Sequence, residues 1–237
     1  MISLIFCSEF DEYNKISFSE RIKVLIRSFA IAFILIFICG LFLTIIDKPI
    51  SAILKVDSFL NVLKKQNNKL YNSYGTKTFF LIAIYGPIIE EIIFRYHLNF
   101  KKNSFAISYS LFFYLLIGGS LVNFNTSNID FYLKIIATIC MFFLLKYLLA
   151  KSNLLEKLKS SHFKIYFYFI SIAFGLIHIS NFENIKYYML PIYILYVLPQ
   201  ICLGLVLGNL RMKTGLIWAI FLHFIFNSIS FLAKTLL

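Results

Sequence analysis

Long apolar runs separated by short polar segments dominate the sequence. A helix needs about 20 mostly apolar residues to cross the hydrocarbon core of a bilayer. Seven runs approach this length, at Ser28–Ile46, Thr78–His97, Ser104–Val122, Phe131–Ala150, Phe163–Ser180, Tyr188–Gly208 and Thr214–Ala233. Because the runs are long and continuous, they favour helices over the short alternating strands of a membrane barrel. The pattern predicts an all-α fold, a polytopic transmembrane helical bundle of about seven spans.

Polar segments flank the first predicted span. Residues 1–24 are expected to form an amphipathic N-terminal segment, interfacial or cytosolic, because residues 8–24 are too polar to cross a membrane. Residues 25–237 then form one intramembrane domain, whose core covers about residues 78–230. Between the first two spans, "ISAILKVDSFLNVLKK" (residues 50–65) has the spaced apolar positions and basic flanks of a surface helix.

The composition agrees with a membrane location. Only 14% of the residues are charged, 60% are hydrophobic and the mean hydropathy is +0.81, whereas soluble domains carry about 25% charged residues. The net charge of +12 fits lysines in loops facing anionic headgroups, and no basic run indicates nucleic-acid binding. We therefore expect an integral, multi-pass protein of a bacterial plasma membrane. With seven spans, more Lys and Arg residues lie on the side of the membrane that holds the N-terminus than on the other side, which favours a cytoplasmic N-terminus.

Two adjacent acids, Glu90 and Glu91, interrupt the second apolar run, and we expect the other nine acids to lie in loops or near the chain ends. A charge at the centre of a membrane helix costs about 2.5–3.5 kcal/mol, and such residues usually mark function. Glu91 and Arg95 are four residues apart and can pair on one helix face. Glu90 has no such partner in its own helix and needs one from elsewhere. Pro87 removes a backbone donor, which frees a carbonyl near Ala83 and predicts a kink.

Further polar side chains occur in later spans. His178 lies in the fifth, and His223 and Asn227 share one face of the seventh; each alone could simply bond to another helix. His97 and His162 lie at span edges and are expected at the membrane interface. Together, a carboxylate, two imidazoles and an amide are the parts of a hydrolytic site, in which a base activates water and donors stabilise an oxyanion.

Three short segments carry a family resemblance: "EEIIFR" (residues 90–95), "FGLIH" (174–178) and "HFIFN" (223–227). In order, they match EExxxR, FxxxH and HxxxN. The chain thereby resembles the CAAX prenyl protease and bacteriocin-processing (CPBP) family of glutamate-type intramembrane endopeptidases. The run "RMKTGLIWAIFLH" (211–223) resembles the same family.

The resemblance implies a role for each matching residue. Glu90 would activate the attacking water and His178 would hold and polarise it, while His223 and Asn227 would line the oxyanion hole. Glu91 with Arg95 would support the site, and Phe174 would pack against it. No metal or other cofactor is implied, and the partner would be a peptide or protein substrate at or in the membrane, such as a bacteriocin-type peptide.

The sequence departs from the family pattern in two places. Tyr96 stands where the family often has glycine, and the segment between Glu91 and His178 is long enough for an extra helical pair, at residues 104–122 and 131–150.

Three alternatives stay open. Glu90, His178 and His223 could bind a catalytic zinc ion. The chain could be a non-catalytic bacteriocin-immunity or membrane scaffold protein of the same fold. Intramembrane Glu and His would also suit a transporter or proton channel.

Overall fold

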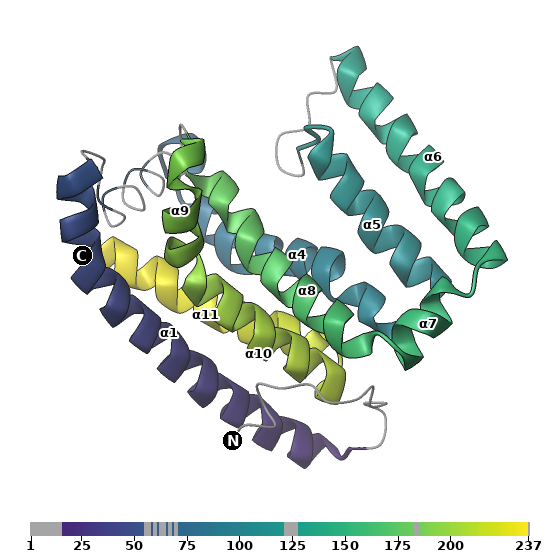
Figure 1. Ribbon diagram of the computed structural model, residues 1–237, viewed down its shortest axis with the longest axis horizontal. Coiled ribbons are helices and arrows are strands. Elements are labelled where there is room, and N and C mark those ends of the chain that lie inside the picture. Colours follow the sequence, from purple (N-terminus) through teal and green to yellow (C-terminus); the bar gives the residue numbers. More distant parts are fainter. Residues whose placement is uncertain are drawn as a thin grey trace. The chain divides into compact units, whose positions relative to one another are not determined.

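The computed structural model describes residues 16–54, 71–120, 128–182 and 185–236, together with residues 58, 61, 65 and 68. Every regular element in these residues is a helix (Figure 1), so the all-α prediction is confirmed. Four helical segments are long and apolar enough to cross a membrane: Phe18–Ile53, Ile129–Lys151, Phe163–Asn181 and Leu216–Ala233; a bent pair would make five. The chain is an integral membrane protein, but seven spans are not confirmed.

The chain folds as two compact units, residues 1–88 with 167–237, and residues 89–166. The boundaries pass through two helices, α4 (Gly86–Phe94) and α8 (Phe163–Leu176). The position of one unit relative to the other is not determined, so each unit is described by itself.

The first unit combines the N-terminal and the C-terminal parts of the sequence. Its elements, besides the start of α4 and most of α8, are α1 (Phe18–Leu54), α3 (Lys77–Phe80), the π-helix η3 (Leu81–Tyr85), the 3-10 helices η5 (Ile177–Asn181) and η6 (Tyr187–Met189), α9 (Leu190–Tyr196), α10 (Leu198–Thr214) and α11 (Leu216–Leu236). Helix α1 packs along α10, and α10 packs against α11 (Figure 1).

Helix α1 is longer than the first predicted span. A capping box starts it, because the amide of Glu20 donates to Ser17 Oγ at 3.3 Å and the amide of Ser17 donates to Glu20 Oε2 at 3.2 Å. Residues 18–24 of the predicted N-terminal segment are thus the first turns of α1, and the interfacial or cytosolic location of residues 1–24 stays a prediction; residues 1–15 lie outside the described part. The predicted surface helix at residues 50–65 begins within α1, which ends at Leu54, and most of its remainder lies outside the described residues.

The sixth predicted span is not one straight helix. Helices α9 and α10 meet at an angle of 52°. Pro199 in the first turn of α10 has no amide hydrogen to continue the hydrogen bonds of α9, so the helix breaks at Val197. Helix α10 then continues past the predicted end at Gly208, to Thr214, where Gly215 with φ of 103° ends it.

Two glycines let α8 approach α10 closely. A Cβ atom on Gly204 would lie 2.6 Å from the carbonyl oxygen of Ser171, and one on Gly208 would lie 2.9 Å from the ring of Phe167. Small residues four apart are the usual means by which membrane helices come into backbone contact. Gly204 and Gly208 thus allow α10 to pack closely against α8, and His178 lies in η5, directly after α8.

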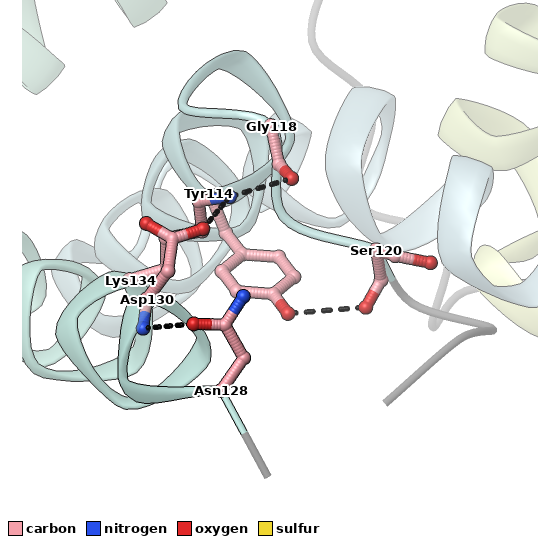
Figure 2. Close-up of polar contacts among 6 residues, drawn as sticks. All are labelled: Tyr114, Gly118, Ser120, Asn128, Asp130 and Lys134. Atoms are coloured by element: carbon pink, nitrogen blue, oxygen red, sulfur yellow. Dashed lines mark hydrogen bonds and ion pairs between the residues drawn. The ribbon is translucent and has the colours of Figure 1, made fainter. Parts of the chain in front are cut away.

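The second unit contains, besides the remaining parts of α4 and α8, the 3-10 helix η4 (Tyr96–Asn99), α5 (Lys102–Leu116), α6 (Ile129–Lys151) and α7 (Leu154–Ser160). Helices α5 and α6 lie side by side (Figure 1), which confirms a helical pair between Glu91 and His178; residues 121–127 lie outside the described part. Lys134 Nζ donates to the carbonyl of Gly118 at 3.1 Å, and Tyr114 Oη donates to that of Ser120 at 3.0 Å (Figure 2). The bond of Lys134 holds the segment after α5 near the start of α6, and the bond of Tyr114 holds that segment back against α5.

His97 is buried among side chains of the protein, and its predicted location at the membrane interface stays a prediction. His97 is only 1% exposed and lies among three aromatic rings of its own unit, with centroid distances of 5.4 Å to Phe105, 5.3 Å to Tyr109 and 5.6 Å to Tyr166. The turn from α4 into η4 folds this residue inward, and apolar periodicity alone does not report such a turn. His162, in contrast, is exposed.

The glycine contact predicts a matched pair of mutational effects. Gly204→Ala should destabilise the protein by about 1–3 kcal/mol, because the new methyl group overpacks the contact with Ser171. Gly40→Ala in α1, whose Cβ would meet nothing within 4 Å, should be neutral or stabilise by about 0.5–1 kcal/mol through reduced chain entropy. Unfolding in mixed detergent micelles measures both. Equal effects would contradict a close helix contact at Gly204.

Candidate active site

The predicted site residues come from both compact units. Glu90, Glu91 and Arg95 lie on or just after α4 in residues 89–166, whereas His178, His223 and Asn227 belong to the other unit. The meeting of Glu90 with the two histidines stays a prediction. Each half of the site has a defined internal geometry.

Glu91 and Arg95 form the ion pair that their spacing predicts. Arg95 Nη1 lies 2.5 Å from Glu91 Oε1, with the two residues 1% and 0% exposed. A charge-assisted hydrogen bond of this kind is strong in a buried setting. The pair joins the last turn of α4 to the residue that follows it.

Glu90 also lies within electrostatic reach of Arg95, the residue that follows α4. Arg95 interacts electrostatically with Glu90 as well as, more strongly, with Glu91. Glu90 is itself half-buried, and its Oε2 atom is shielded from solvent. The guanidinium of Arg95 therefore acts on both Glu90 and Glu91, whereas the sequence spacing paired it with Glu91 alone.

His178 is held at the point where α8 changes into the 3-10 helix η5. Its Nδ1 atom lies 2.9 Å from the carbonyl oxygen of Phe174. A carbonyl can only accept, so Nδ1 carries the proton in this bond, and in the neutral ring Nε2 is the acceptor. The geometry therefore leaves Nε2 as the nitrogen that could receive a proton or a water hydrogen bond.

Phe174 brings the two predicted histidines together. Its ring centroid lies 5.2 Å from that of His178 and 5.6 Å from that of His223, both edge to face. Phe174 is 1% exposed and His223 2% exposed, whereas His178 is half-buried. Two imidazoles from α8–η5 and α11 thus share one buried aromatic neighbour, within a single unit.

Asn227 lies one turn after His223 and bonds to an irregular helix. The kink predicted near Ala83 falls in the π-helix η3, and Asn227 Nδ2 donates to the carbonyl of Ile82 at 3.0 Å. This carbonyl is one residue before Ala83, because the i to i+5 bonds of a π-helix shift the missing donor of Pro87 by one position. One of the two amide hydrogens of Asn227 is occupied by this bond.

A family model described as Type II CAAX prenyl endopeptidase Rce1-like matches residues 73–229. The chain belongs to the Rce1-like family. The predicted resemblance is thereby confirmed, and the Rce1-like match includes every predicted site residue. No curated protein and no solved structure matches the chain.

A buried acid that the sequence interpretation missed lies outside the Rce1-like match. Asp47 of α1 is 3% exposed and accepts a hydrogen bond of 2.9 Å from Tyr196 Oη of α9. We had expected every acid except Glu90 and Glu91 to lie in a loop or near a chain end, and this is wrong. The apolar run "ISAIL" after Asp47 is the signal that the helix continues past it.

Within either unit, the described residues contain no group of three or more His, Cys, Asp or Glu side chains placed to hold a metal ion. The zinc alternative would need ligands from both units.

Loss of one member of the Glu91–Arg95 pair should be costly. Glu91→Ala removes the closest carboxylate from a buried guanidinium and should destabilise the protein by about 3–5 kcal/mol. The matched control is Asp130→Ala, which breaks the Asp130–Lys134 pair of the same spacing (2.6 Å, side chains 57% and 24% exposed; Figure 2) and should cost about 0.3–0.5 kcal/mol. Similar losses in reversible unfolding would contradict a buried pair.

Proposed function

We propose that the chain is an intramembrane endopeptidase that cleaves membrane-associated peptides with a water activated by Glu90 and His178. The observation that carries this proposal is the grouping of His178 and His223 around Phe174, inside an Rce1-like match that also contains Glu90. The proposal requires the two units to bring Glu90 to the histidines.

The reaction would proceed by addition of water to the peptide carbonyl. Glu90 takes a proton from the water while His178 Nε2 accepts a hydrogen bond from it, and the resulting hydroxide attacks the carbonyl carbon. The proton then passes from Glu90 to the leaving amine as the C–N bond breaks. The products are a carboxylic acid and an amine, which exchange a proton to give a carboxylate and an ammonium ion, so one water is consumed and the scheme uses no cofactor.

The developing oxyanion would be stabilised by His223 and Asn227. His223 can donate from a ring nitrogen, and Asn227 has a second amide hydrogen besides the one bonded to Ile82. Preorganised donors in a water-poor site are typically worth about 2.7–4 kcal/mol each. The Glu91–Arg95 pair would hold the end of α4 and thereby the direction of Glu90.

The substrate class follows from the family and the location. The family is described as CAAX prenyl endopeptidase-like, so a prenylated C-terminal peptide is the first substrate to test. Unprenylated membrane peptides, including bacteriocin-type peptides, are the second, since a site among apolar helices could admit either.

Glu90→Ala should abolish cleavage. The purified protein is reconstituted in liposomes with a farnesylated CAAX peptide or an unprenylated membrane peptide, and products are measured by mass spectrometry. Glu90→Ala and His178→Ala should each remove detectable cleavage, because the water then lacks its base or its second partner. Glu156→Gln, at an exposed acid of α7, is the matched control and should cleave normally.

Two results would contradict the water-activation scheme. Normal processing by Glu90→Ala would remove the glutamate from the mechanism. Loss of wild-type activity on chelation, with stoichiometric zinc in the active protein, would favour the metal site instead.

His223→Ala should lower kcat by about 10²–10³-fold with little change in KM, because an oxyanion donor acts mainly in the transition state. Steady-state kinetics in the same liposomes measure the effect. A rise in KM at constant kcat would instead indicate that His223 binds substrate and does not stabilise the oxyanion.

A further inference from the structure

We propose that Asn227 is a positioning residue whose side-chain amide replaces the backbone donor that Pro87 lacks, and so holds the π-turn that sets the direction of the Glu90 helix. The inference rests on the proposed function only in taking Glu90 as the group that must be aimed. The hydrogen bond and its consequence for the helix stand on geometry alone.

The hydrogen bonds around the π-helix leave one carbonyl in need of a donor. At the end of the π-helix η3, the amide of Gly86 donates to the carbonyl of Leu81, five residues earlier. The next carbonyl, of Ile82, would receive the amide of residue 87 in the same register, but Pro87 has no amide hydrogen. Asn227 Nδ2 supplies the donor at 3.0 Å.

Helix α11 is placed along this segment by a second contact. The ring centroids of Phe79 and Phe231 lie 5.4 Å apart. Phe231 comes four residues after Asn227 in α11, and Phe79 comes three residues before Ile82. The two contacts define an antiparallel register between α11 and the segment from residues 79 to 82. The bond of Asn227 is therefore part of a packed helix contact.

The π-turn controls where Glu90 points. A π-turn accommodates one extra residue, so the helix after it is rotated by about 100° relative to an uninterrupted α-helix. Glu90 lies in α4, directly after this turn. Without a donor for Ile82, the segment can relax toward the α register, in which the amide of Gly86 reaches Ile82 and Glu90 turns away from its present face.

A thermodynamic cycle tests the hydrogen bond. Asn227→Ala should lower the melting temperature of the detergent-solubilised protein by about 2–4 °C, because a carbonyl loses its donor. In a Pro87→Ala background the loss should be much smaller, since the amide of residue 87 in the π register, or that of Gly86 in the α register, then reaches Ile82. Ser228→Ala, at the neighbouring position of α11, should give the same shift in both backgrounds. Equal effects of Asn227→Ala in both backgrounds would overturn the proposal.

A spin label tests the rotation itself. The label is attached at Glu90→Cys in a chain whose four native cysteines are replaced, and its spectrum is compared with and without Asn227→Ala. We expect a changed mobility and oxygen accessibility with Asn227→Ala and none with Ser228→Ala; an unchanged spectrum would overturn the positioning role. Both experiments need no substrate, so they remain decisive even if the chain cleaves no peptide and the proposed function fails.

Discussion

A bilayer offers no hydrogen-bond partners to polar groups, so every such group in a span must be met by another from the chain. Three pairs in this protein answer that constraint: Glu91 with Arg95, Asp47 with Tyr196, and Asn227 with the carbonyl of Ile82. The bonds of Asp47 with Tyr196 and of Asn227 with Ile82 each join helical segments that are distant in sequence, whereas Glu91 and Arg95 pair within one helical turn. The first two bonds therefore fix contacts between helices, and the third fixes the end of α4.

The irregular parts of the backbone accompany the candidate site. His178 is the second residue of the 3-10 helix η5 that follows α8, and Glu90 follows a π-turn. Irregular backbone is tolerated at membrane depth only where the protein itself satisfies the freed groups, as Asn227 does for Ile82. The side chains proposed for chemistry are thus placed by local departures from the α-helix, and those departures are stabilised by neighbouring helices.

The sequence predicts the regular part of this structure well. Helices α6, α8 and α11 are long apolar runs, and the Glu91–Arg95 pair follows from i, i+4 spacing. The bend between α9 and α10 could have been read from Pro199, but hydropathy averages over it. The burial of His97 and Asp47 depends on contacts between segments distant in sequence, which periodicity does not encode. For the same reason, spacing could not reveal that Arg95 acts on both Glu90 and Glu91.

The central claim is that Glu90 meets His178 and His223 across the bundle, and a thiol crosslink tests it most directly. Cysteines are placed at positions 90 and 178, or 90 and 223, in a chain without native cysteines, and treated in membranes with dibromobimane, which becomes fluorescent when it bridges two nearby thiols. The account predicts bridging for both pairs and none for the three proteins that carry a single cysteine at position 90, 178 or 223. Absence of bridging at 90–178 and 90–223, in protein that is folded and whose single thiols react, would contradict it.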